Sequence, residues 1–285
     1  MKRVLRVIGT IVFLLVLYYL LQVLLLSASM TIAVLVGGLP PESLQFMDDA
    51  QYLAENPAVA AYIVNGQAIG LFLSALIMLL FIHFTGFYRL SLQHLRSLAP
   101  RPFLFSTLVV FFSMFVLNIF VQWFPLENNM SDTFLGLSRN AVGIMGLAFF
   151  GPLLEEVLFR GAIQGLLMRF FGRPWPAIVV AALVFGVFHM NPVQIVYATL
   201  LGIVLGWIYY RTGSLLSVIV GHVLNNSLAV VTTLLYSSAE EEAVADSSFG
   251  IVNFLVFAFL SIFFAVKLHR SLPPVEEQNT EDRLA

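Results

Sequence analysis

The stretch AVGIMGLAFFGPLLEEVLFRGAIQGLL, residues 141–167, decides the fold. A bilayer crossing needs a helix of roughly 20 mostly apolar residues, and this stretch is long enough to supply one. It nevertheless carries Glu155, Glu156 and Arg160, and a charged side chain at membrane depth costs about 2.5–3.5 kcal/mol on insertion scales. The stretch therefore predicts a membrane-spanning helix whose charged residues have a structural or functional reason to be there.

The composition of the whole chain indicates a membrane protein. Of its 285 residues, 60% are hydrophobic and 11% are charged, and the mean hydropathy is +0.93. A soluble domain carries about 25% charged residues, so we expect the bilayer to be the solvent of this chain. The net charge of -2 and the lack of a basic stripe argue against a nucleic-acid partner. The absence of cysteine excludes disulfides, thiolate zinc sites and a cysteine nucleophile.

Long apolar runs predict the spanning helices. They lie at residues 5–27, 58–84, 103–124, 141–167, 175–190, 193–210, 214–236 and 249–267. We therefore expect an all-α fold, a polytopic membrane helix bundle of about eight transmembrane helices. The fifth and sixth runs are short, and Met190-Asn191-Pro192 leaves room only for a tight turn between them.

The basic residues predict the orientation, because short cytoplasmic loops hold most of the Lys and Arg. With the N-terminus inside, Arg139 lies outside and Arg160 within the membrane, which leaves 12 of the 14 basic residues on the cytoplasmic side. The outer segments are acidic and include Glu240-Glu241-Glu242. We expect a multi-pass protein of the cell (plasma or inner) membrane with both termini in the cytoplasm.

The first polar cluster is the Glu155-Glu156 pair with Arg160. Glu156 and Arg160 are four residues apart on a helix, so their side chains can pair, and a packing role explains both. Glu155 lies about 100° round the helix and has no cation nearby in sequence. A buried carboxylate without a cation suits a proton acceptor or donor.

Two further polar motifs follow in later spans. Phe185 and His189 share one helix face, although a single membrane histidine is more often a packing residue than a functional one. His222 and Asn226 also share a face, and their ordinary role would be an interhelical hydrogen bond of about 1 kcal/mol. Asn225 lies off that face and is the weaker candidate. The cost of burying these groups falls if they satisfy one another, so we expect them in one polar pocket.

The order Glu-Glu-x-x-x-Arg, Phe-x-x-x-His, His-x-x-x-Asn resembles the CPBP family, which comprises the type II CAAX prenyl endopeptidases and the bacterial Abi, or bacteriocin-processing, membrane proteins. The matching stretch runs from Gly143 to Leu228, under a third of the chain, and includes Arg211-Thr212-Gly213-Ser214-Leu215. On this basis we divide the chain into three parts. They are residues 1–140, transmembrane helices without motifs; residues 141–236, a catalytic core of the CPBP/Abi type; and residues 237–285, the last transmembrane helix and a polar cytoplasmic tail.

The resemblance implies an intramembrane endopeptidase whose site lies in a cavity open toward the cytoplasm. It implies that Glu155 and His189 activate a water molecule, and that His222 and Asn226 stabilise the oxyanion or orient the substrate carbonyl. The supporting residues would be Glu156, Arg160 and Phe185. The substrates would be membrane-associated, prenylated or peptide substrates, and the bilayer and the substrate are the partners that we expect.

The residue types suit peptide hydrolysis independently, because it needs a base, a donor for the oxyanion and restricted access of water. The zinc-peptidase motif His-Glu-x-x-His is absent from the sequence. Glu155, His189 and His222 are nevertheless three zinc ligands of suitable type. We expect a glutamate-dependent mechanism without a cofactor, with zinc as the alternative.

Two other functions fit the same residues. A proton-coupled transporter would use Glu155 and His189 as a relay, and it predicts discontinuous helices, such as a break at Gly151-Pro152. A non-catalytic membrane protein of the bacteriocin-immunity or assembly type would keep the fold without cleaving a substrate.

Overall fold

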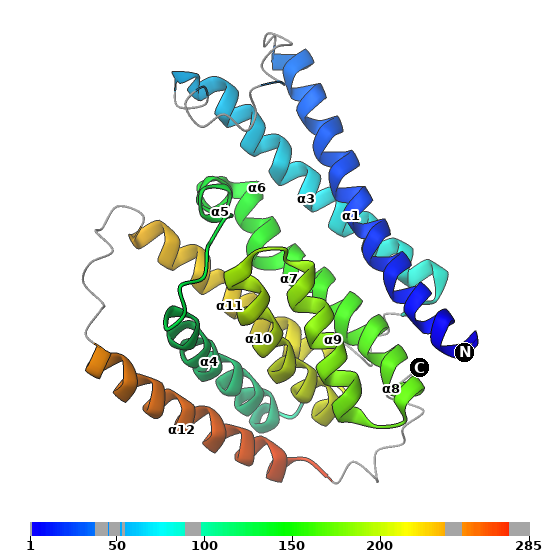
Figure 1. Ribbon diagram of the computed structural model, residues 1–285, viewed down its shortest axis with the longest axis vertical. Coiled ribbons are helices and arrows are strands. Elements are labelled where there is room, and N and C mark those ends of the chain that lie inside the picture. The colour runs from blue at the N-terminus through cyan, green and yellow to red at the C-terminus, as the bar shows by residue number, and fades with distance from the viewer. Residues whose placement is uncertain are drawn as a thin grey trace.

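The computed structural model describes residues 2–37, 45, 52, 55–88, 98–236 and 247–273. Several predictions concern other parts of the chain: the basic residues Arg89, Arg96 and Arg283, the Glu240-Glu241-Glu242 run and most of the polar tail lie outside the described residues. Every regular element in the described part is a helix, which confirms the all-α prediction (Figure 1).

Each predicted apolar run coincides with a helix, or with consecutive helical segments, to within a few residues, except that the first helix continues to Gly37, and the short helix Ser131–Ser138 lies outside these runs. Their bounds are α1 (Lys2–Gly37), α3 (Pro57–Thr85), α4 (Pro100–Gln122), α5 (Ser131–Ser138), α6 (Ala141–Met145), η2 (Gly146–Phe150), α7 (Gly151–Glu155), η3 (Glu156–Gln164), α8 (Gly165–Phe171), α9 (Pro174–Phe188), α10 (Pro192–Thr212), α11 (Leu215–Tyr236) and α12 (Ser247–Ser271). In the described ranges, seven helices are long and apolar enough to cross a membrane. The fifth predicted span, α9, is a shorter apolar helix of 15 residues.

Proline and glycine set the helix boundaries as their backbone chemistry requires. Proline occupies the first turn of α3, α4, α9 and α10, where its missing N–H leaves no helical bond unmade. Gly86, Gly172 and Gly213 follow helix ends with φ of 77°, 63° and 63°, a left-handed conformation that costs glycine little. The tight turn between α9 and α10 is confirmed, and in it Met190 has a φ of 51°.

The helices pack in an up-and-down arrangement (Figure 1). α1 packs along α3, α9 along α10, and α4 along α12. The N-terminal end of α1 meets the C-terminal end of α8, where Arg3 donates a hydrogen bond to the carbonyl oxygen of Arg169 at 2.9 Å. The ends of α10 and α12 also meet, because Arg211 donates to the carbonyl oxygen of His269 at 3.2 Å.

The continuous helix from α6 to α8 provides much of the core. Leu154, Leu158 and Ile163 on it have no exposed surface. They belong to one hydrophobic cluster that also includes Leu14 of α1 and Met78 of α3. Glu156 and Arg160 of this helix therefore lie inside the bundle, where only other protein groups can satisfy them.

Candidate active site

The helix that carries the acidic pair changes its hydrogen-bond pattern twice. The segments η2 and η3 are π-helical and flank the single α-helical turn α7. The N–H of Gly151 bonds the carbonyl oxygen of Gly146, five residues back. The helix thus continues through Gly151-Pro152, and the break that a transporter would use there is not present. π-Helical turns are rare in proteins, and those that occur are often found at functional sites.

Glu156 and Arg160 pair as their spacing predicts. Arg160 Nη1 lies 2.8 Å from Glu156 Oε1, and the two side chains are 2% and 0% exposed. The guanidinium carbon of Arg160 lies 4.6 Å from the centroid of the Phe185 ring, a cation–π contact. The Gly202 carbonyl of α10 accepts a longer bond of 3.5 Å from Arg160 Nη2. The arginine therefore joins η3, α9 and α10.

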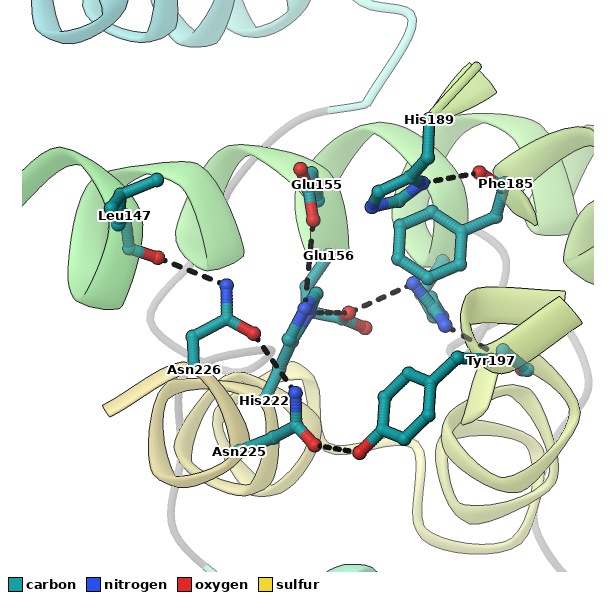
Figure 2. Close-up of polar contacts among 11 residues, drawn as sticks. Leu147, Glu155, Glu156, Phe185, His189, Tyr197, His222, Asn225 and Asn226 are labelled. Atoms are coloured by element: carbon teal, nitrogen blue, oxygen red, sulfur yellow. Dashed lines mark hydrogen bonds and ion pairs between the residues drawn. The ribbon is translucent and has the colours of Figure 1, made fainter. Parts of the chain in front are cut away.

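His222 lies between the two carboxylates (Figure 2). Its Nδ1 lies 2.7 Å from Glu156 Oε1, and its Nε2 lies 3.5 Å from Glu155 Oε2. Because Glu156 Oε1 acts as the acceptor for Arg160, we place a hydrogen on His222 Nδ1, which then donates to the same oxygen. No partner for Glu155 could be identified from the sequence, and in the structure its partner is the imidazole of His222 from α11. The Glu155 side chain is 18% exposed, so it is the carboxylate of the pair that a water molecule or substrate can reach.

His189 caps the end of α9, and its own turn of helix orients its ring. Its Nδ1 lies 2.8 Å from the carbonyl oxygen of Phe185, and a carbonyl can only accept. The ring therefore carries its hydrogen on Nδ1 and keeps a lone pair on Nε2 when it is neutral. Figure 2 shows the ring directed toward Glu155. The Phe185 ring lies 4.8 Å from the His189 ring and 5.8 Å from the His222 ring, so it packs against both.

The helix α9, which ends at the site, is shorter than the other apolar helices. A helix of 15 residues is about 22 Å long, less than the thickness of about 30 Å of the hydrocarbon core. A helix that begins at one membrane surface therefore ends inside the membrane. Asn191, which follows in the turn and is fully buried, donates to Asn128 Oδ1 at 2.9 Å.

Asn226 joins the site through a chain of hydrogen bonds that the sequence did not predict (Figure 2). Its Nδ2 donates to the carbonyl oxygen of Leu147 at 2.9 Å, and its Oδ1 accepts from Asn225 Nδ2 at 3.0 Å. Asn225 Oδ1 in turn accepts from the Tyr197 hydroxyl at 2.5 Å. Asn225 was the weaker candidate in the sequence, yet its side chain is buried and holds the middle of this chain. Tyr197 is separated from it by 28 positions and had no motif to indicate it.

Tyr18 is a second residue that sequence reasoning missed. It comes from α1, is 2% exposed, and its ring stacks on Phe188 at 5.4 Å. Phe188 directly precedes His189, so α1 contributes to the wall of the site. Residues 1–140 show no motif, and nothing in the sequence around Tyr18 distinguishes it from other aromatic residues of that span.

The zinc alternative depends on whether three ligands come together. Among the residues that the structure describes, no group of three or more His, Cys, Asp or Glu side chains is arranged to hold a metal ion. Both nitrogens of His222 already face carboxylates, and Nδ1 of His189 faces a carbonyl. The donor set Glu155, His189 and His222 therefore does not form a metal site in this arrangement.

The fold and the site together define a class: a polytopic helical membrane protein with a buried acid–base site. Residues 137–228, about a third of the chain, match the family model described as type II CAAX prenyl endopeptidase Rce1-like. The matched segment contains the acidic pair, both histidines and both asparagines. The match supports a protease of the CAAX type and confirms the suspected CPBP resemblance. Searches of curated proteins and of solved structures gave no match.

Proposed function

We propose that this chain is an intramembrane endopeptidase that uses Glu155 as its base. The observation that carries the proposal is the position of Glu155: it is partly exposed, it faces His222 Nε2 at 3.5 Å, and the ring of His189 is directed toward it. Glu156 is fully buried and already accepts from Arg160 and His222, so it lacks the access that a catalytic base needs. The match to a CAAX endopeptidase family supports the same reaction.

In the proposed reaction, Glu155 and His189 Nε2 hold a water molecule. The water oxygen attacks the carbonyl carbon of the scissile bond while Glu155 takes one of its protons. The carbonyl oxygen becomes an oxyanion, to which His222 Nε2–H, when that nitrogen is protonated, and the second N–H of Asn226 donate. The C–N bond then breaks, the proton on Glu155 passes to the leaving amine, and the carboxyl product retains the water oxygen.

The charges of the site suit this role for His222. Glu155 and Glu156 carry two negative charges when ionised, and Arg160 balances one of them. A proton on His222 Nε2 balances the other and makes the buried cluster neutral, which lowers the cost of burying it. The same proton turns the nitrogen into a donor for the oxyanion.

An apolar groove beside the site supports a membrane-associated substrate. The groove has a volume of about 840 Å³ and lies between α1, α8 and α9. Its lining runs from Val4 and Phe171 to Phe188 and Met190, the two residues on either side of His189. We propose that the substrate is a peptide with an attached prenyl chain or an apolar membrane segment, because such a group can occupy the groove while its peptide bond meets Glu155.

The proposed reaction needs no metal. We expect the purified protein to keep its peptidase activity after chelation, with metal analysis verifying that zinc has been removed. Full loss of activity on removal, restored by added zinc, would contradict the metal-free mechanism and favour Glu155, His189 and His222 as zinc ligands.

The experiment that tests the proposed base uses the purified protein in liposomes with a farnesylated CAAX peptide as the probe. We expect Glu155→Gln to lower cleavage by about 10²–10⁴-fold, since it removes the base without changing the shape of the side chain. The control is Glu127→Gln, an exposed carboxylate in the connection between α4 and α5, which should cleave like the wild type. Full activity in Glu155→Gln would contradict the mechanism.

A further inference from the structure

One carbonyl group fixes the direction of every hydrogen bond in the chain from Leu147 to Tyr197. The Leu147 carbonyl can only accept, so the Asn226 atom beside it at 2.9 Å is the amide nitrogen. Asn226 therefore turns its oxygen to Asn225, which must present its own nitrogen. That leaves the Asn225 oxygen for the hydroxyl of Tyr197, which donates. No member of the chain can be flipped without setting two acceptors or two donors against each other.

The carbonyl of Leu147 is available because of Pro152. In η2 the N–H of Gly151 bonds the carbonyl of Gly146, in the five-residue π pattern. The same pattern would pair the Leu147 carbonyl with the N–H of residue 152, but proline has none. The proline thus leaves a helical carbonyl without its helical donor inside the bundle, where such a group needs another partner. The Asn226 amide supplies that partner from α11.

We infer that Pro152, Asn225 and Tyr197 are positioning residues that hold the Asn226 amide in its catalytic orientation. The inference rests on the proposed function, in which Asn226 donates to the oxyanion. A primary amide has two N–H groups: Leu147 holds one and the second is free for the substrate. A flipped amide would present its oxygen instead, and an acceptor beside an oxyanion is repulsive.

If these hydrogen bonds have only a structural role, a different result is expected. Interhelical hydrogen bonds in membranes contribute to helix packing, so their loss would lower stability and the amount of folded protein. A positioning role predicts that the folded protein binds its substrate normally and turns over more slowly. The separation of kcat from KM in folded protein therefore distinguishes the two.

The sharpest variant is Pro152→Ala, which restores an N–H that competes with Asn226 for the Leu147 carbonyl. We expect kcat to fall about 10-fold with KM nearly unchanged, a smaller loss than the 10²–10³-fold that follows removal of an oxyanion donor itself. Pro102→Ala is the matched control, because Pro102 lies in the first turn of α4, where a missing N–H leaves no helical bond unmade. It should cleave like the wild type.

Asn225→Asp and Tyr197→Phe test the other end of the chain without changing its shape. Aspartate can still accept from Tyr197 but cannot donate to the Asn226 oxygen, so we expect it to lower kcat more than Tyr197→Phe does. Asn226→Asp, which removes the donor itself, should show the largest loss. Equal kcat values for wild type, Asn225→Asp and Pro152→Ala would overturn the inference.

A readout that does not depend on activity separates this inference from the proposed function. In protein with isotope-labelled asparagine side chains, the Asn226 amide resonance is identified by its loss in Asn226→Asp. We expect Pro152→Ala and Tyr197→Phe to shift it and Pro102→Ala to leave it in place. An unmoved resonance overturns the positioning inference even if the enzyme is active. Peptidase activity that survives Glu155→Gln overturns the proposed function even if the resonance moves.

Discussion

Glu156 shows how one buried carboxylate organises the site. Its Oε1 accepts from Arg160 at 2.8 Å and from His222 Nδ1 at 2.7 Å. Its Oε2 is buried and has no hydrogen-bond partner among the described residues. One carboxyl oxygen thus contacts both a guanidinium and an imidazole, and the same imidazole faces Glu155. The role of Glu156 is therefore structural: it holds Arg160 and His222 in place beside Glu155, for which we propose the chemical role.

We predict that Arg160→Ala mainly lowers stability. It leaves Glu156 buried without the guanidinium that pairs with it, and breaking a buried ion pair costs about 3–5 kcal/mol. Thermal unfolding of the detergent-solubilised protein should show a clear fall in Tm. The control is Arg270→Ala, an exposed arginine at the end of α12 whose loss should have little effect. An Arg160→Ala protein as stable as the wild type would refute this role.

At the residue scale, the sequence predicts charged and strongly polar groups well, because each one is costly in a membrane. Glu155, Glu156, Arg160, His189 and His222 could all be selected on that basis. Tyr197 and Tyr18 could not, because tyrosine is common in apolar spans and its partners are distant in sequence. Besides the two asparagines, the local signal for this hydrogen-bond chain is Pro152, which removes a donor from the middle of a helix.

At the scale of elements, the close contact of α9 with α10 places His189. Gly186 makes this contact possible: a Cβ at this position would overlap the Thr199 hydroxyl and lie 2.6 Å from the carbonyl oxygen of Ile195. At Gly202, further along the same interface, a Cβ would lie 3.1 Å from Ala182. A Cβ at Gly206 would likewise lie 3.1 Å from the Ile178 side chain of α9, so these glycines let the two helices pack closely, as small residues do in membrane proteins.

We predict that Gly186→Ala separates α9 from α10 and moves His189 away from Glu155. Overpacking of this kind costs about 1–3 kcal/mol, so both Tm and peptidase activity should fall. Gly9→Ala in α1 is the matched control, since a Cβ there has no neighbouring atom within 4 Å. Unchanged activity and Tm in Gly186→Ala would show that α9 does not need this close approach.

The sequence predicts helices better than it predicts their internal geometry. Apolar runs locate each helix, because hydropathy reports the length of chain that the bilayer must cover. Hydropathy does not report hydrogen-bond patterns, so η2 and η3 were not predicted, and Gly151-Pro152 suggested a break that the structure does not contain. The bundle accommodates the proline through a π-helical turn and a side chain from another helix.

At the scale of the whole molecule, basic residues gather where helix ends meet. Arg3 contacts the end of α8, and Arg211 contacts the end of α12, which also carries Lys267 and Arg270. The helices therefore place at one side of the bundle the residues that the positive-inside pattern groups together. We propose that this side faces the cytoplasm.

The lack of native cysteine makes the proposed orientation simple to test. We predict that Arg270→Cys reacts with a membrane-impermeant thiol reagent only after the cells are permeabilised. Glu127→Cys, at an exposed position between α4 and α5, should react in intact cells. The reverse pattern would invert the topology, and labelling of both residues in intact cells would contradict a bundle with α12 crossing the membrane.

The part of the molecule before the family match contributes more than its sequence suggests. The match covers residues 137–228, yet α1 supplies Tyr18 to the wall of the site and one side of the apolar groove. Contacts between distant helices depend on three-dimensional packing, which a motif does not encode. The motifs therefore locate the chemistry, whereas the groove that would select the substrate becomes visible only in the folded bundle.

The most direct test of the central claim, a Glu155-dependent peptidase, works without an identified substrate. Membranes from cells that lack the protein are incubated with purified wild-type or Glu155→Gln protein in water enriched in heavy oxygen, and new peptide C-termini are identified by mass spectrometry. Hydrolysis places one water oxygen in each new carboxyl group. We predict heavy-oxygen C-termini in membrane-associated proteins with the wild type and none above background with Glu155→Gln. Identical sets from the two proteins, or no new C-termini with the wild type, would contradict the account.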